Sequence, residues 1–395
     1  MYKPLFLTGT ARGGTNLVKW ILESSNQISL ESEPYLPLYT SFRNASLENF
    51  IKSKNISFNK SSPLDDYYYN DRKIKFMEKI QRTKLTLKYN YKSNKKLKEQ
   101  ISTRMNDYVP YLRKYVKNFN QKSYKKMFDI ALEIVSKSNL QKENNYIGWL
   151  DNWIIEFYPH LSEAYKKAQF IVIFRDVRAS ISSTLKRKDP ENAPSILSFI
   201  RCWRKQVAFA AMLKKNKLLK KRILFIKYED LVSKPKLYVK KICKHLKIKY
   251  SEKMLNVKKF KPLGKNKNWK PNSNYNTKKK YIYKSSINRW KSNLNKDMIA
   301  FIEFVAGNDL KFLGYKLYYP KNYMKINKRI INFISKEIKS RNGWSTDIFS
   351  LKQNLEFESL RNNYIKKKII DKKKIKFFFL NYEIYQKLLK KKKFF

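Results

Sequence analysis

The chain has 395 residues, and its formal net charge of +57 is extreme for a protein of this length. Hydrophobic residues make up 42% of the sequence, which is typical of a globular protein with a full core and excludes a disordered chain. The abundance of Lys, Asn, Ile, Tyr and Phe is partly typical of AT-rich codon usage. The charge still favours attraction to polyanions or anionic surfaces, although it does not identify a partner.

The cysteines and histidines favour neither a disulfide framework nor a metal site. Cys202 and Cys243 both lie in segments with helical periodicity, which predicts buried thiols in a reducing compartment. His160 and His245 are far apart and lack ligand-like neighbours, so we expect no metal. The first predicted strand begins almost at residue 4, and no apolar run approaches the roughly 20 residues that span a bilayer. We therefore expect a cytoplasmic protein, with contact to a membrane surface left open.

The amino-terminal stretch predicts a strand, a glycine-rich turn and a helix in direct succession. Residues 5–7 are an apolar run typical of a buried strand, and residues 17–22 place apolar side chains on one helical face. The turn between them, residues 9–14, directs backbone N–H groups and the positive helix end at one spot, and its glycines let a phosphate approach closely. This predicts an anion site with Arg12 as its cation; an ordinary glycine-rich turn is the alternative.

Two carboxylates follow the second predicted strand, residues 27–30. The sequence there is Glu31-Ser32-Glu33-Pro34, and Pro34 favours an extended Glu33 at the carboxyl end of the strand. Ligands of open parallel sheets bind at that edge, and two carboxylates beside an anion-binding loop would cost energy if they had no function there. Solvated loop acids are the alternative.

The central part of the chain predicts a helical insertion followed by the rest of a sheet. Residues 44–145 are rich in Lys, Asn and Tyr and predict helices such as 107–119 and 123–136. Strands are expected over residues 146–151, 170–174 and 223–228. Strands that alternate with helices indicate a three-layer α/β/α fold with a mostly parallel central sheet. The tyrosines of the insertion either contact an acceptor or cover a core, and the sequence leaves both open.

The strand at residues 170–174 runs directly into Arg175. A metal-dependent kinase would carry a carboxylate at such a position, whereas a guanidinium favours a second phosphate. We expect Arg178, in the following helix, to be solvated. Further helices are predicted over residues 195–215, from Pro235, and from an Asn295 cap to Gly307.

The carboxyl-terminal stretch, residues 321–395, has a different character from the rest of the chain. Isoleucines recur there at helical spacing, and runs of Lys alternate with Phe, Tyr, Ile and Leu. We expect a basic helical extension. It packs on the core, forms an oligomer contact, or lies on an anionic membrane surface, and the sequence does not decide among these.

Taken together, these motifs resemble the PAPS-dependent sulfotransferase superfamily in its bacterial and carbohydrate-sulfotransferase form. Arg12-Gly13-Gly14-Thr15 is similar to the 5′-phosphosulfate loop of that family. The stretch FIVIFRDVRASISS, with Arg175 and Ser183 at the family's interval, resembles its 3′-phosphate motif. Residues 223–231 resemble its strand-YEDL element, and SSINRWKSNL with the following helix resembles its carboxyl-terminal segment.

The resemblance implies a P-loop-like sulfotransferase domain over residues 1–320 that contains the helical insertion. It implies transfer of a sulfuryl group from PAPS (3′-phosphoadenosine 5′-phosphosulfate) to a hydroxyl of a glycan, glycolipid or small molecule, with PAP as product and no metal. Glu33 is then the catalytic carboxylate, with Glu31 as second choice, and Arg12 stabilises charge on the bridging oxygen. The implied donor-binding residues are Arg12, Gly13, Gly14, Thr15, Asn16, Arg175, Ser183, Tyr228, Lys284 and Ser285. Asn16, Val177 and Asn152 depart from the residues usual in the family.

Two other classes of function remain open at this stage. An ATP-dependent P-loop phosphotransferase would need a loop Lys and Ser/Thr where Thr15 and Asn16 stand, and Arg175 also argues against it. The net charge favours a basic protein that binds nucleic acid or a membrane surface without catalysis. No nucleic-acid motif is visible in the sequence, so we expect no specific nucleic acid. The sequence also does not decide whether the chain forms an oligomer.

Overall fold

The computed structural model describes residues 2–54, 60, 71–90, 94–138, 145–186, 193–256, 282, 284, 286–320, 325–339, 350–368 and 371–395. The chain forms two compact units, each with its own packing. Unit 1 consists of Met1–Asn49, Ile80–Phe174 and Lys217–Lys284, and unit 2 consists of Phe50–Lys79, Arg175–Asn216 and Ser285–Phe395.

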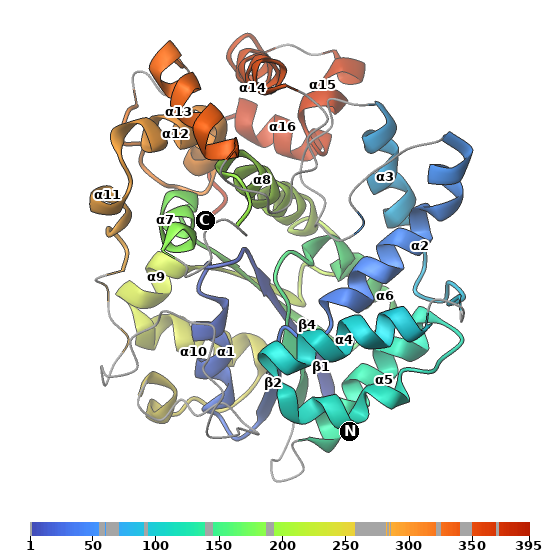
Figure 1. The fold of residues 1–395 in the computed structure, drawn as a ribbon. Coiled ribbons are helices and arrows are strands. Elements are labelled where there is room, and N and C mark those ends of the chain that lie inside the picture. Colours follow the sequence, from blue (N-terminus) through green and yellow to red (C-terminus); the bar gives the residue numbers. More distant parts are fainter. Residues whose placement is uncertain are drawn as a thin grey trace. The chain divides into compact units, whose positions relative to one another are not determined.

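Unit 1 is built on a sheet of five parallel strands, which runs through its centre (Figure 1). The strands are β1 (Lys3–Gly9), β2 (Ile28–Ser32), β3 (Tyr146–Leu150), β4 (Gln169–Phe174) and β5 (Ile223–Lys227), in the order β2-β3-β1-β4-β5. The first four strands are buried over almost their whole length, which explains why they read as apolar runs without alternation. All five predicted strands and the parallel α/β class are confirmed.

The register of the strands brings their carboxyl ends to one edge. Gly9 at the end of β1 pairs with Ile173 of β4, and Ser32 at the end of β2 pairs with Leu150 of β3. The glycine turn after β1, the acidic turn after β2 and the residues that follow β3 therefore start from the same edge. Parallel sheets bind their ligands at such an edge.

Helices cover both faces of this sheet. Helix α1 (Thr15–Glu23) joins β1 to β2, and α5 (Tyr124–Lys137) precedes β3. The connection from β1 to β2 crosses the sheet in the direction opposite to that from β2 to β3, so right-handed crossovers place α1 and α5 on opposite faces. Figure 1 shows α1 to the left of the strands and α5 to their right.

The described part of the long connection from β2 to β3 is mainly helical, but one predicted helix is divided in two. It contains α2 (Leu36–Lys54), α3 (Asp71–Arg82), α4 (Asn94–Tyr108), the 3-10 helix η2 (Pro110–Asn118) and α5. The helix expected over residues 107–119 is split, because Pro110 disfavours the helical conformation at Val109 and opens a new turn. The helix expected over residues 123–136 is confirmed as α5, which Ser123 caps by accepting from the Lys126 N–H.

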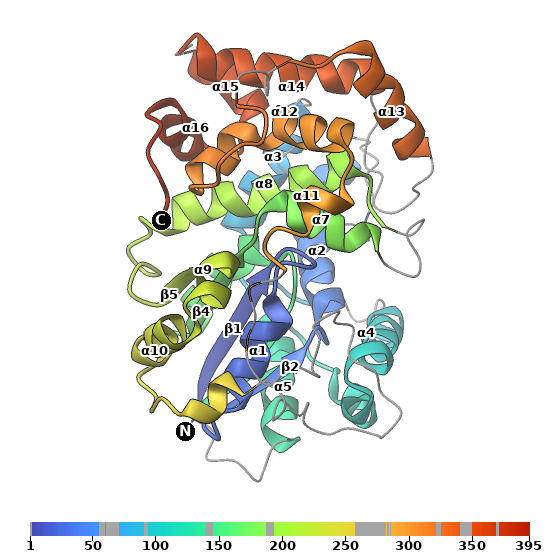
Figure 2. The same ribbon diagram turned by 90° about the vertical axis from the view of Figure 1, so that its left-hand side faces the viewer.

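Unit 2 is helical. Its centre consists of α7 (Val177–Leu185), α8 (Ile196–Leu213) and α12 (Lys296–Phe312), with α11 (Trp290–Asn293) against α7. Helices α13 (Lys328–Lys339), α14 (Leu351–Lys366), α15 (Lys372–Phe378) and α16 (Tyr382–Leu389) follow. Figure 2 shows α8 below α12 and α14 above it. Asn295 caps α12 as predicted, but the helix continues past the buried Gly307, and the left-handed Gly314 follows its end.

Buried ion pairs hold the carboxyl-terminal helices on α8 and α12. Glu358 of α14 accepts from Arg201 Nε at 3.0 Å and from Arg204 Nη1 at 2.5 Å, with each side chain 1% exposed. Arg361 Nη1 pairs with Asp309 Oδ2 at 3.0 Å. Burial raises the pKa of Glu358, but the two arginines of α8 outweigh it and lower that pKa to about 2. The described part of the carboxyl-terminal stretch therefore packs on α8 and α12 within unit 2, while the domain boundary at residue 320 stays a prediction.

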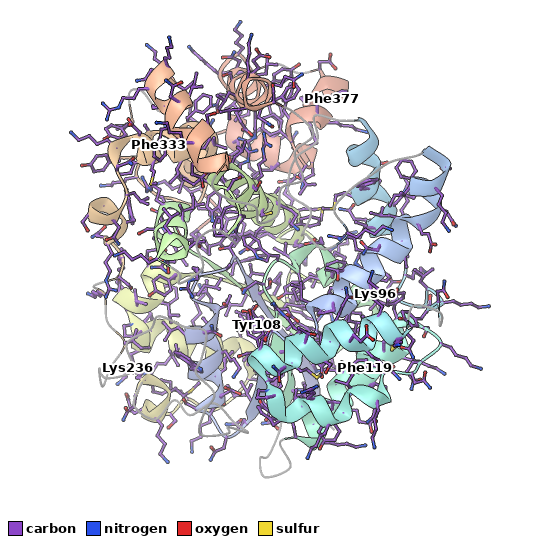
Figure 3. All side chains as sticks on the ribbon, viewed as in Figure 1. Lys96, Tyr108, Phe119, Lys236, Phe333 and Phe377 are labelled. Atoms are coloured by element: carbon purple, nitrogen blue, oxygen red, sulfur yellow. The ribbon has the colours of Figure 1, made fainter. Side chains whose placement is uncertain are left out.

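Other expectations from composition concern thiols and surface charge. Cys202 and Cys243 are buried free thiols, as predicted. Lys96 of α4 and Lys236 of α10 (Pro235–Leu246), both labelled in Figure 3, are exposed. Helix α10 begins at Pro235, as expected. Among the helices that the structure describes, none combines the length and the apolar character that a membrane span requires.

Candidate active site

The turn between β1 and α1 lies at the edge of the sheet where the strands end, and it contains two left-handed residues. The Gly13 N–H donates to the Thr10 carbonyl at 2.9 Å, and Arg12 (φ 61°) and Gly14 (φ 93°) are left-handed. Gly14 occupies the N-cap position of α1, so no side chain caps the first turn, which begins at Thr15. A helix start of this kind suits a phosphate or sulfate group, because its N–H groups and dipole favour negative charge.

Two constraints require glycine at position 14. A Cβ atom there would lie 2.3 Å from Cδ2 of Tyr228, and the φ of +93° strains any residue with a side chain. Tyr228 is the buried first residue of α9 (Tyr228–Ser233), directly after β5. Of the predicted donor-binding residues, Tyr228 therefore packs its ring on the glycine turn. The hydroxyl of Thr10 is buried there and has no hydrogen-bond partner among the described residues.

Glu33 is fixed from several elements of unit 1. It is left-handed (φ 50°) and not extended as predicted, because its N–H donates to the Leu150 carbonyl at 2.7 Å as the chain turns away from β2. Asn152 Nδ2 donates to Oε1 of Glu33 at 2.9 Å, and Arg104 Nη2 donates to Oε2 at 2.6 Å. Thr15 donates in turn to Asn152 Oδ1 at 3.3 Å. Hydrogen bonds thus connect the first residue of α1 with the carboxylate of Glu33.

The two acids of this turn differ in their access to solvent. Glu31 is 1% exposed; the hydroxyls of Tyr111 and Ser138 donate to its two oxygens. Burial, with the charge of Glu31 added, raises the pKa of Tyr111 well above its ordinary value. The side chain of Glu33 is 12% exposed. The alternative that both are solvated loop acids is wrong, and of the two Glu33 has the greater access to solvent.

Asp151, directly after β3, adds a third carboxyl group that the sequence analysis missed. It is fully buried, and the Tyr35 N–H donates to its Oδ2 at 3.2 Å. Burial raises its pKa well above the ordinary value; the charge of Arg104 opposes this, and that of Glu33 adds to it. The position at the carboxyl end of a strand was a signal for Asp151. Arg104 had no such signal, because it lies 71 residues from Glu33 in the chain.

The residues predicted to hold a 3′-phosphate begin in unit 2. Arg175 directly follows β4, and its Nη2 donates to the Ser286 carbonyl at 3.4 Å. The indole of Trp203 donates to the carbonyl of Arg175 at 3.1 Å, which ties this turn to α8. Ser183 lies on α7 and is partly exposed.

Three predicted donor contacts remain, two in the loop before α11 and one at the start of α1. Lys284 is exposed and is the last residue of unit 1, whereas Ser285 lies outside the described residues. Asn16 is the second residue of α1 and is partly exposed. The roles of these residues stay predictions.

Arg178 is not the solvated helix residue that we expected. It is 2% exposed, its Nη2 pairs with Asp176 Oδ2 at 2.6 Å, and its Nη1 pairs with Glu303. Its guanidinium lies 4.2 Å from the centre of the Trp290 ring. Burial lowers the pKa of Arg178, but the two carboxylates outweigh it and raise that pKa. The local sequence did not show this role, because Glu303 lies 125 residues further along the chain.

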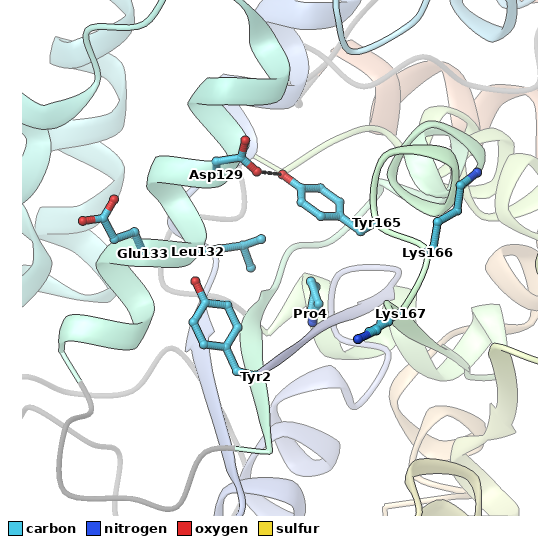
Figure 4. Close-up of a pocket in the computed structure, with 8 residues that line it drawn as sticks. All are labelled: Tyr2, Pro4, Asp129, Leu132, Glu133, Tyr165, Lys166 and Lys167. Carbon is cyan, nitrogen blue, oxygen red and sulfur yellow. Dashed lines mark hydrogen bonds between the residues drawn. The ribbon is translucent and has the colours of Figure 1, made fainter.

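An open pocket of about 610 Å³ lies in unit 1 at the amino ends of the strands (Figure 4). Its lining residues are Tyr2, Pro4, Asp129, Leu132, Glu133, Tyr165, Lys166 and Lys167. Tyr165 donates to Asp129 Oδ1 at 2.8 Å across it. Because Tyr2 and Lys167 precede β1 and β4, this pocket lies at the edge opposite the glycine turn and is distinct from the candidate site.

The family model described as "Sulfotransferase family" matches residues 4–252, well over half of the chain. The chain belongs to the sulfotransferase family. No curated protein matches the sequence. Within the residues that the structure describes, no group of three or more His, Cys, Asp or Glu side chains has the placement to hold a metal ion.

Solved sulfotransferase structures are similar to this chain at low identity. The sulfotransferase domain from the curacin biosynthetic pathway is 13% identical, with 85% of this chain and 98% of that chain covered and a TM-score of 0.43. The sulfotransferase domain of the Synechococcus PCC 7002 olefin synthase is 14% identical, with 75% and 90% covered and a TM-score of 0.41. A sulfotransferase from Mycobacterium tuberculosis H37Rv is 14% identical, with 64% and 70% covered and a TM-score of 0.30. The family assignment depends on the match over residues 4–252.

Proposed function

We propose that this sulfotransferase moves a sulfuryl group from PAPS to a hydroxyl of a glycan, glycolipid or small-molecule acceptor. The observation that carries the proposal is the hydrogen-bonded connection from Thr15 through Asn152 to Glu33. It joins the start of an uncapped helix, which favours an anion, to a partly exposed carboxylate. An anion site beside a base is what sulfuryl transfer to a hydroxyl requires.

The glycine turn suits the phosphosulfate end of the donor. Its left-handed Arg12 and Gly14 and the uncapped start of α1 favour a bound anion. The donor supplies the activated sulfuryl group. Arg12 and the N–H groups of the turn stabilise the negative charge that develops on the bridging oxygen.

The proposed step is an in-line displacement. The acceptor oxygen forms a bond to sulfur while the bond between sulfur and the bridging oxygen breaks. The electron pair of the broken bond stays on the phosphate of PAP, and the acceptor proton goes to Glu33. A positioned general base of this kind typically contributes about 10²–10⁴-fold to the rate.

We assign the 3′-phosphate to Arg175 and Ser183, and further donor contacts to Tyr228, Lys284 and Ser285, on the basis of the resemblance. Arg175 directly follows β4, which pairs with β1, and this supports the assignment. We further propose that residues 1–320 form the catalytic domain and that the protein acts in the cytoplasm.

Turnover of labelled PAPS tests the proposed function. Wild-type, Glu33→Gln and Glu31→Gln proteins are incubated with ³⁵S-labelled PAPS and a monosaccharide, a phenol and a fatty alcohol, with water present as a further acceptor. We expect Glu33→Gln to lower turnover about 10²-fold or more while PAP affinity stays within about twofold. No wild-type turnover to any acceptor would refute the proposal. If Glu31→Gln loses turnover while Glu33→Gln keeps it, Glu31 and not Glu33 is the base.

The same preparations separate the other classes of function. Magnesium-dependent binding of ATP in place of PAP would identify a phosphotransferase. Binding of mixed-sequence DNA that survives physiological salt would identify a nucleic-acid-binding protein, whereas loss at higher salt is expected from charge alone.

A further inference from the structure

Arg104 makes two contacts with the proposed base, one to its main chain and one to its side chain. Its Nε donates to the carbonyl oxygen of Glu33 at 3.0 Å, and its Nη2 donates to Oε2 at 2.6 Å. The two side chains are 23% and 12% exposed, so water screens the pair only in part. A guanidinium presents its donors in a rigid fork, which fixes the carboxylate in orientation as well as in charge.

The main-chain contact supports a strained conformation. Glu33 has a φ of 50°, in the left-handed region that is strained for a residue with a side chain. The N–H of Glu33 is bound to the Leu150 carbonyl, and its own carbonyl accepts from Arg104. The conformation that turns this carboxylate away from β2 is therefore held from both sides of the residue.

Arg104 is itself held in place by its own helix. Tyr108, one turn further along α4 and labelled in Figure 3, has its ring centre 4.3 Å from the guanidinium carbon. Nη1 of Arg104 donates to the Tyr108 hydroxyl at 3.4 Å. The guanidinium is thus oriented by α4 before any substrate arrives, and the helical connection between β2 and β3 contributes directly to the candidate site.

Several titratable groups act on this pair. Burial lowers the pKa of Arg104, but the charges of Glu33, Tyr108, Asp151 and Asp107 outweigh it, and that pKa is raised. Tyr108 and Asp107 lie on α4, and Asp151 follows β3. Because the attraction is mutual, the guanidinium favours the carboxylate form of Glu33 over the protonated acid.

We propose that Arg104 is a positioning residue for the transfer step, which holds Glu33 ionised and oriented toward the acceptor. This inference rests on the proposed role of Glu33 as base. Asn152 donates to Oε1 and Arg104 donates to Oε2, so the carboxylate keeps one orientation, from which it takes up the proton of the acceptor hydroxyl. Without the guanidinium, Glu33 is protonated at a higher pH, and turnover begins only above that pH.

The test is the pH profile of ³⁵S-PAPS turnover from pH 3.5 to 8 with the same acceptors and water, a range that includes the ordinary titration range of a Glu side chain. We expect Arg104→Met to move the acid limb up by about 1–3 pH units, the range for a carboxylate that loses an arginine partner. Arg104→Lys keeps the charge but not both bonds, so its limb stays near the wild-type position while its maximal rate falls. Arg113→Met is the matched control, because Arg113 is exposed and its Nε donates to Ser102 at 3.1 Å.

The outcomes separate this inference from the proposed function. If Arg104→Met lowers turnover equally at every pH, Arg104 only anchors α4 and the inference is overturned. If Glu33→Gln keeps its turnover, the assignment of the base itself is wrong. Should Arg104→Met fail to fold, Tyr108→Ala replaces it, with a smaller shift expected in the same direction; an unmoved limb in a folded Tyr108→Ala protein contradicts the inference.

Discussion

Replacing Glu358 with Gln removes the negative charge at the centre of a buried cluster. Arg201 and Arg204 are each 1% exposed and share this carboxylate, so the change leaves two buried guanidiniums without their counter-charge. Removing one partner of a buried ion pair costs about 3–5 kcal/mol. We expect Glu358→Gln to lower the free energy of unfolding by that amount at neutral pH.

The pKa of Glu358 gives a second estimate of how much its charge stabilises the fold. It is about 2 in the folded protein, against an ordinary value of 4.5. A depression of this size corresponds to about 3 kcal/mol of stability. Because the folded pKa is the lower one, this stability is present above about pH 4.5 and is lost as the pH falls toward 2.

Urea unfolding between pH 3 and pH 7 measures this contribution. Glu356→Gln, on the exposed side of the same helix, is the matched control and should change stability by less than about 0.5 kcal/mol. The difference between wild type and Glu358→Gln should shrink as the pH falls. A difference that stays constant with pH, or a loss at pH 7 equal to that of the control, would refute the electrostatic reasoning.

Two further predictions concern unit 1. Burial raises the pKa of Asp151, so its ionisation at rising pH favours the unfolded state. In urea unfolding, the free energy of unfolding of the wild type relative to Asp151→Asn should therefore fall above about pH 4, by up to about 1.4 kcal/mol per pH unit. A difference that does not change with pH contradicts this. Gly14→Ala should lower the melting temperature and weaken PAP binding, because its Cβ meets Tyr228 at a left-handed φ. The decrease in melting temperature should be smaller when Gly14→Ala is made in a Tyr228→Ala protein. An equal decrease in both proteins would show that the Tyr228 ring does not obstruct the added Cβ.

The strands were predictable because each signal is local. A buried parallel strand needs an apolar run, and residues 170–174 supply one without interruption. The glycine turn was predictable for the same reason, since the apolar strand, the glycines and the helical pattern that define it are adjacent in the sequence. From parallel strands it also follows that Glu33 starts from the same edge as that turn.

The contacts that fix the site were not predictable, because they join distant parts of the chain. Arg104 pairs with Glu33 from a helix of the insertion, and Arg178 forms an ion pair with Glu303 of α12, far along the chain. Charged residues in helices are usually solvated, so the pattern around Arg178 indicated the wrong environment. Gly307 was misread for a related reason: burial against neighbouring helices lets α12 continue through it.

Calorimetric titration of PAP into wild-type and Arg175→Ala protein, without divalent metal, tests most directly the central claim that this chain binds a nucleotide with a 3′-phosphate as its donor. We predict that the wild type binds PAP under these conditions, and that Arg175→Ala weakens PAP about 10–100-fold, the effect of one charged hydrogen bond. Adenosine 5′-phosphosulfate, which lacks the 3′-phosphate, should lose little affinity. Absence of PAP binding, or an equal loss for both nucleotides, would contradict the proposed donor and the role of Arg175.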